Sequence, residues 1–229
     1  MGLRLFAAVV VLAGCGFKPG RAVVPDVRPP ADSPVADSMV DSPPDSPPIL
    51  GSLTMTMANA TGDINLTTEG TADWVQWGHA GKTTAERKAG VNAISNLAAT
   101  PSTTASPTTV TESWTDGSPD TNVNNNDVAV VEVQGSSMDF TAPAGIAQRT
   151  LRVYVGVQQS SSRISVTLSD ASAIAVPLTL TNNSGDTYAC FTITYNAAHD
   201  GQTLAVDWTD LADVAGSQHF TMLLAATLQ

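Results

Sequence analysis

Basic residues, cysteines and aromatic side chains are all scarce in this chain of 229 residues. Ten lysines and arginines stand against 21 aspartates and glutamates, and the formal net charge is −11 at pH 7. Nucleic-acid binding needs clustered basic side chains that neutralise phosphates, so this balance argues against a nucleic-acid partner. It also argues against electrostatic docking on anionic lipid. The apolar run Leu5–Leu12 is about half as long as the roughly 20 residues that a membrane-spanning helix needs.

The N-terminus has the layout of an export signal. Arg4 precedes the apolar run, and small residues follow it. The segment Leu12-Ala13-Gly14-Cys15 resembles the lipobox of bacterial lipoproteins, in which the cysteine is lipidated and becomes the first residue of the mature chain. The resemblance implies a signal peptide over residues 1–14 and a membrane anchor at Cys15. N-myristoylation is not indicated, because Phe6 stands where that signal needs serine or threonine.

Lipidation of Cys15 would leave Cys190 without an intramolecular partner, since the chain has two cysteines. The exported domain must then be stabilised by core burial, which about 180 residues can provide. Cys190 itself is either a small buried residue or a free thiol. Gly16 differs from the aspartate that would resemble an inner-membrane retention signal. We therefore expect a lipid-anchored protein of the cell envelope, at the outer membrane or the cell surface.

Residues 15–50 read as a spacer. They contain Arg28–Pro34 and then Asp41–Pro48, in which prolines alternate with aspartate and serine. Proline favours extended backbone, and the segment has too few large apolar residues for a core. We expect a disordered, partly polyproline linker that reaches on the order of 100 Å when extended. A ligand for a proline-recognition domain is an alternative, which the lack of basic residues after Arg28 disfavours.

From residue 51 the pattern changes to alternation of apolar and polar side chains. A period of two predicts half-buried strands over residues 53–57, 151–157, 164–168, 191–195, 204–208 and 220–228. Turn residues cluster at 60–63, 115–119, 182–186 and 198–201. This spacing predicts one all-β domain, 51–229, folded as an antiparallel β-sandwich of about ten strands. Residues 84–97 come closest to helical spacing, and residues 99–109 are expected to form a loop.

Several segments of this domain resemble a β-sandwich module of secreted bacterial proteins. The longest are Gly70–Gly78, Ser113–Gly117, Phe140–Ala144 and Arg149–Gly156, and shorter ones lie at 94–97, 168–170, 201–204 and 225–228. That module often accompanies carbohydrate-active enzymes. The resemblance implies an accessory, non-catalytic, jelly-roll-like domain, and it suggests sugar binding by association. This chain departs from the module at Gln76, where a histidine is expected.

A sugar site needs an exposed aromatic ring and polar groups that hold hydroxyls. Trp208 alternates in phase with core positions and is assigned to the core. On one strand Val75 and Trp77 share one face, and Trp74 shares the other with Gln76. Trp114 lies in phase with two carboxylates beside a turn. The predicted carbohydrate-binding residues are therefore Trp74, Gln76, Glu112, Trp114 and Asp116; for both tryptophans the alternative is a structural role at the sandwich edge.

Other chemistries find little support in the sequence. The oxygen-rich segments Asn122–Asp127 and Asp207–Asp213 could hold calcium, but neither matches an EF-hand loop. The three histidines lack metal-ligand spacing, and no G-x-S-x-G or phosphate-binding glycine loop is present. We expect no catalytic residue, no cofactor and no metal. The leading hypothesis is a non-catalytic module that binds glycan weakly at the cell surface, and the alternative is a structural or adhesive module that binds a partner protein.

Overall fold

The computed structural model describes residues 50–107, 109–132, 135–213 and 219–229, which belong to the compact unit Ser46–Gln229. The signal peptide predicted over 1–14, the anchor predicted at Cys15 and the linker up to residue 49 lie outside the described residues. In the described part, no helix is both long and apolar enough to cross a membrane.

The described residues form sixteen strands and very little helix. The strands are β1 (Ser52–Asn59), β2 (Gly62–Asn65), β3 (Asp73–Trp77), β4 (Ala85–Lys88), β5 (Thr103–Ala105), β6 (Val110–Trp114), β7 (Gly117–Ser118), β8 (Val123–Asn126), β9 (Ala129–Glu132), β10 (Ser137–Ala144), β11 (Arg149–Gln158), β12 (Ser160–Leu168), β13 (Leu178–Thr181), β14 (Asp186–Asn196), β15 (Gln202–Asp213) and β16 (Phe220–Leu228). One helical turn, α1 (Leu66–Glu69), begins after Asn65, whose side chain accepts a hydrogen bond from the Thr68 amide. A 3₁₀ turn, η1, spans His79–Gly81.

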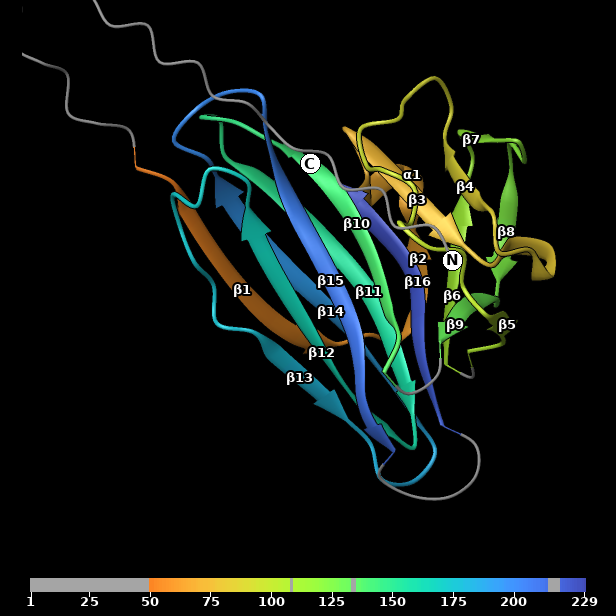
Figure 1. Cartoon of the computed structure of the whole chain (residues 1–229). Helices are drawn as coiled ribbons and strands as arrows, with labels where there is room; N and C mark the ends of the chain where they lie inside the picture. Colours follow the sequence, from red (N-terminus) through yellow and green to blue (C-terminus); the bar gives the residue numbers. More distant parts are fainter. Residues whose placement is uncertain (1–49, 108, 133–134, 214–218) are drawn as a thin grey trace, which may run out of the picture. The chain divides into compact units, whose positions relative to one another are not determined.

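Two sheets pack face to face as a β-sandwich (Figure 1). The larger sheet has the order β1-β14-β11-β16-β3-β4-β7, with β9 also paired to β16 and β5 to β9. The facing sheet has the order β10-β15-β12-β13, and β2-β6-β8 form a third, small sheet. All pairs are antiparallel except β2 with β6. The predicted all-β antiparallel sandwich is confirmed.

The connections between the long strands resemble a jelly roll. From β10 to β16 the chain passes repeatedly from one sheet to the other, staying in the same sheet only between β12 and β13. Let β1 be the first of eight strands and β10–β16 the second to the eighth. The facing sheet, β10-β15-β12-β13, then has the order second, seventh, fourth, fifth, which is the order in a jelly roll. The larger sheet differs from a jelly roll because β14 and β16 have exchanged places.

The main core lies between the two sheets and is built from the alternating residues that the sequence indicates. Phe191 and Trp208 pack with ring centroids 5.8 Å apart, and both side chains are fully buried. Indole Nε1 of Trp208 donates to the Met222 carbonyl at 3.0 Å, so its one polar group is satisfied. The core assignment of Trp208 is confirmed.

A second core lies on the other face of the larger sheet. It forms where the chain between β1 and β10 folds as β2–β9, to the right in Figure 1. Strand β3 lies between the two cores: Val75 and Trp77 face the main core, and Trp74 faces the second. The predicted division of these residues between two faces is confirmed. Both faces are nevertheless buried, because β3 has packed side chains on each side.

Two details differ from the sequence-based expectation. The segment 84–97, for which no convincing helix was expected, contains the strand β4. The expected loop 99–109 includes the three-residue strand β5. The strands outnumber the expected ten because those of two to four residues are too short to display alternation.

Candidate functional site

Trp74 and Trp114 lie against each other in the second core. Their ring centroids are 5.3 Å apart and the rings are tilted by 43°. The two residues are 0% and 1% exposed, respectively. The expectation of an exposed aromatic platform at these positions is wrong. Burial has a clear cause, since β6 and α1 pack over the face of β3 that would otherwise meet solvent.

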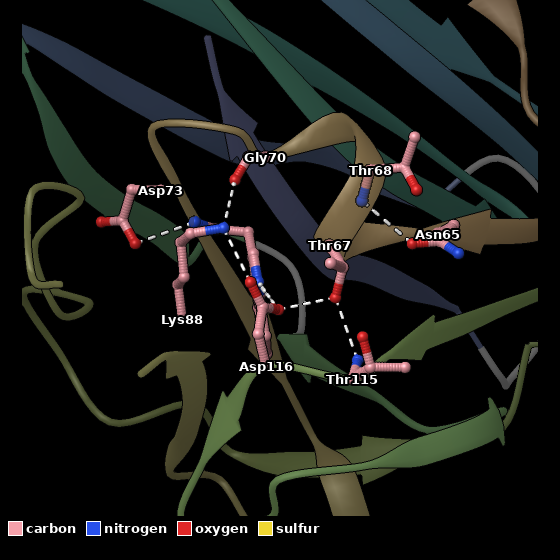
Figure 2. Close-up of polar contacts among 9 residues, drawn as sticks. Asn65, Thr67, Thr68, Gly70, Asp73, Lys88, Thr115 and Asp116 are labelled. Atoms are coloured by element: carbon pink, nitrogen blue, oxygen red, sulfur yellow. Dashed lines mark hydrogen bonds and ion pairs between the residues drawn. The ribbon is translucent and has the colours of Figure 1, made fainter. Parts of the chain in front are cut away.

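Asp116 ties the turn after β6 to this core (Figure 2). Its carboxylate accepts hydrogen bonds from Lys88 Nζ at 2.7 Å, Thr67 Oγ1 at 2.6 Å and Trp74 Nε1 at 2.9 Å. Partial burial opposes ionisation, but these three donors outweigh it and hold the pKa of Asp116 below its ordinary value. The carboxylate is therefore engaged by the protein itself.

Gln76 and Glu112 are buried in an adjoining polar network. Gln76 Nε2 donates to the carbonyls of Trp77 at 2.6 Å and Val128 at 2.7 Å. Asn126 Nδ2 donates to Glu112 Oε2 at 2.9 Å and to the same Val128 carbonyl at 3.1 Å. Burial raises the pKa of Glu112 to about 8, although the Asn126 hydrogen bond opposes that shift. Neither side chain has a surface on which a glycan could bind.

His79 completes this network and was not identified from the sequence. Its Nδ1 lies 2.9 Å from Asn126 Oδ1, and its Nε2 lies 3.1 Å from Asp120 Oδ2. The imidazole packs edge-on against Trp114, with centroids 5.3 Å apart. The structure thus brings all five predicted residues into neighbouring contacts, but as the interior of the β2–β9 region.

An open groove lies on the outer face of the facing sheet β10-β15-β12-β13, away from these residues. It has a volume of about 500 Å³, and Phe140 and Val206 contribute to its wall. Its polar lining comes from three adjacent strands and one loop: Asp139 and Thr141 on β10, Asp207 on β15, Ser165 and Thr167 on β12, and Ser95 and Asn96. The strand residues alternate with Phe140, Val166, Val206 and Trp208 of the core, so the same period that builds the sandwich presents them outward.

The loop at residues 95–98, which we call the loop over β10, forms one wall of the groove. Ser95 N donates to Thr141 O and Ala98 N donates to Asp139 O, both at 2.8 Å, so the loop covers the free edge of β10. The second core region positions this loop. Asp73 Oδ2 accepts from the amides of Ala93 and Ile94, each at 2.8 Å.

Arg87 holds the same loop from the side. It donates from Nη1 to the Ile94 carbonyl at 2.6 Å and from Nη2 to Asn96 Oδ1. Burial lowers the pKa of Arg87, and the charge of Asp73 opposes that shift. Asn96 also lines a second hollow of about 320 Å³ beside Trp77, so the loop separates two depressions.

The groove is acidic. Asp139 and Asp207 are directly opposite each other on β10 and β15, and no lysine or arginine lines the groove. Ser137 Oγ donates to Asp139 Oδ2 at 2.9 Å, and Thr209 Oγ1 donates to Asp207 Oδ1. Like charges directly opposite on a sheet destabilise it. A ligand that donates hydrogen bonds or is positively charged suits this arrangement, and an anionic ligand does not.

The residues considered for metal binding and for thiol chemistry can also be located in the structure. No group of three or more histidine, cysteine, aspartate or glutamate side chains that could hold a metal ion occurs in the described part of the chain. The two oxygen-rich segments, 122–127 and 207–213, lie mainly in β8 and β15. Cys190 is a free, half-buried cysteine on β14, and burial raises the pKa of its thiol.

The protein is thus an all-β sandwich with a β-rich region, β2–β9, inserted between β1 and β10, and with a polar groove on one outer face. Comparisons with protein-family models, with curated proteins and with solved structures found no match for this chain. The resemblance to a secreted bacterial module and to a lipobox therefore stays a prediction.

The groove residues were not predicted from the sequence, although their polar character is visible there. Ser165, Thr167 and Asp207 are polar positions within the alternating segments 164–168 and 204–208. What local sequence does not contain is the order β10-β15-β12, which places these strands side by side. That order gathers five polar side chains into one depression, and the loop adds Ser95 and Asn96.

Proposed function

We propose that this chain is a lipid-anchored, extracytoplasmic, non-catalytic β-sandwich that binds a glycan weakly in the groove between β10, β12 and the loop at residues 95–98. The observation that supports the proposal is the lining of the groove. Hydroxyl and carboxylate groups on three strands, together with the amide of Asn96 on the loop, face one open depression. Such groups fix the hydroxyls of a sugar, which donates hydrogen bonds to carboxylates.

Weak affinity is expected because the groove lacks an exposed aromatic face. Phe140 lines the groove but is 3% exposed, so its ring offers little area for stacking on a pyranose. The acidic pair adds selectivity. Neutral and amino sugars are the expected ligands, and glycans rich in uronate, sulfate or phosphate are expected to be rejected.

Anchoring at the cell envelope is the second component of the proposal. It rests on the sequence of residues 1–15 and on the proline-rich spacer that follows. An acyl anchor and a long spacer would hold the groove away from the membrane, where surface polysaccharide is accessible.

A glycan array tests the binding directly. The full chain, purified in detergent, should be retained on neutral or amino glycans, and Asp207→Asn or Thr167→Val should weaken retention at least tenfold. Asp63→Asn is the matched control, because Asp63 is an exposed carboxylate on β2 outside the groove. Absence of retention on every glycan would overturn the binding proposal. Release of reducing ends from a bound glycan would overturn its non-catalytic part.

A module that binds a partner protein is the second candidate. The connection between β12 and β13 carries two highly exposed apolar side chains, Ile174 at 88% and Val176 at 80%. Exposed apolar groups of this kind mark protein contacts when they gather on one surface. Crosslinking on intact cells should then recover a partner that Ile174→Ser loses and Asp207→Asn retains; recovery of none would count against this candidate.

A further inference from the structure

Strand β1 is an open edge of the larger sheet. It pairs with β14 along residues 52–59 without a register shift, and no other strand in the described part of the chain pairs with it. Its outer positions Thr54 and Thr56 are exposed, as are all three residues from Met57 to Asn59. The sequence Ser52–Asn59 contains no charged residue, no proline and no glycine. Among the residues that the structure describes, the outward-facing backbone donors and acceptors of β1 therefore have no strand partner.

Other sheet ends in the described part are protected or short. The outer edge of β10 is covered by hydrogen bonds from the loop at Ser95 and Ala98. Strands β13 and β7, which end the two large sheets elsewhere, have four and two residues. Natural sheets protect long edges with charge, proline, bulges or covering segments, and β1 has no charge, no proline and no bulge. A long edge left open in this way is suited to pairing with another strand.

The side chains of β1 favour a second copy of the same strand. The chain has a net charge of −11, so two copies repel each other, and β1 offers an uncharged surface for close approach. Two antiparallel β1 strands related by a two-fold axis keep their faces matched when Met55 lies opposite Met55. Leu53 then lies opposite Met57, whose side chain is 46% exposed in the single chain.

The position of the N-terminal segment is compatible with this pairing. Residue 50 immediately precedes β1, so the two linkers leave from opposite ends of the paired strands, about 20 Å apart. The extended linker predicted from the sequence, with a reach on the order of 100 Å, would allow both chains to be anchored in one membrane. We propose that the protein forms a two-fold homodimer in which the β1 strands of two copies pair and make one continuous sheet.

Sedimentation of the full chain in detergent tests the dimer. Wild type should sediment as a dimer at tens of micromolar, and Thr56→Lys should weaken dimerisation at least tenfold because it places two like charges near the axis. Thr121→Lys, in the exposed connection between β7 and β8, adds the same charge elsewhere and should not. Thr56→Lys should still unfold cooperatively, which separates lost pairing from lost folding.

Disulfide trapping tests the register. In a background with Cys15→Ser and Cys190→Ser, Met55→Cys should form a covalent dimer on mild oxidation, and Thr121→Cys should not. A monomer at every concentration, or a dimer unchanged by Thr56→Lys, would overturn the proposal. A dimer without the Met55→Cys crosslink would overturn the register.

Discussion

Glu112 is buried next to an amide that satisfies one carboxylate oxygen, while Oε1 has no hydrogen-bond partner in the described part of the chain. Burial raises its pKa from 4.5 to about 8, so the folded state keeps a proton that the unfolded chain releases near pH 4.5. The contribution of Glu112 to stability is therefore fully present below pH 4.5 and is lost as the pH rises towards about 8.

We predict that Glu112→Gln removes this slope and raises the free energy of unfolding by roughly 3 kcal/mol at pH 7. Glutamine can still accept from Asn126 and never ionises. Denaturant melts between pH 4.5 and 8 measure the effect, with Asp200→Asn as an exposed control. An identical pH slope in wild type and Glu112→Gln would contradict the predicted protonation of Glu112.

Trp74 belongs to the interior, and its replacement should act through stability. Trp74→Ala removes a buried ring and leaves the Asp116 carboxylate without one of its donors. We predict a loss of about 3–5 kcal/mol in the free energy of unfolding. The glycan affinity of the folded fraction should be unchanged, as measured by titration below the melting temperature. A specific loss of affinity in a variant of wild-type stability would return the site to Trp74.

At the scale of the element, the long strands were predictable and the inserted region was not. Residues 151–157 and 204–208 alternate because one face meets the core and the other meets solvent. The local pattern is therefore enough to predict a strand and its buried face. Strand β3 has no such contrast, because every residue from Asp73 to Trp77 is buried. Its outer cover comes from β6 and α1, and no property of residues 73–77 alone reveals it.

The candidate site illustrates the same limit. The sequence pattern predicted that Trp114 shares a face with Glu112 and Asp116 in solvent, but in β6 Glu112 and Trp114 are buried on one face, and Asp116 lies in the turn that follows. Carboxylates on either side of a tryptophan suggest an exposed site. Here Lys88 and Asn126 donate hydrogen bonds to these carboxylates, and such long-range contacts are not visible in the local sequence. The groove depends on strand order, which is set by the whole sheet topology.

The loop over β10 provides a prediction at this scale. Arg87 holds residues 94–96 through two hydrogen bonds, so Arg87→Met should loosen the wall of the groove. We expect faster hydrogen exchange at the Ser95 and Ala98 amides, and a severalfold weaker glycan affinity. Arg163→Met, an exposed arginine on β12, is the matched control. Unchanged exchange at both amides in Arg87→Met would contradict the role of Arg87 in holding the loop.

At the scale of the whole molecule, the acidic composition of the chain does not favour contact with a membrane, whereas the N-terminal sequence predicts a membrane anchor. The chain is too acidic to be attracted to an anionic membrane surface, so the membrane attachment proposed above would depend on acylation of Cys15. Two acyl signals suffice for stable anchoring without any contact between the sandwich and lipid. The groove and the open edge of β1 would then both be accessible on a tethered domain.

We predict that replacing Cys15 transfers the protein from the membrane to the soluble fraction. In a bacterial host, wild type should partition into the detergent phase and incorporate labelled fatty acid, and Cys15→Ser should do neither. Cys190→Ser is the matched control, because it removes the other cysteine and leaves the N-terminus intact. Detergent partitioning that persists in Cys15→Ser would show that another segment attaches the chain to the membrane. A labelled Cys15→Ser protein would move the acylation site away from the lipobox.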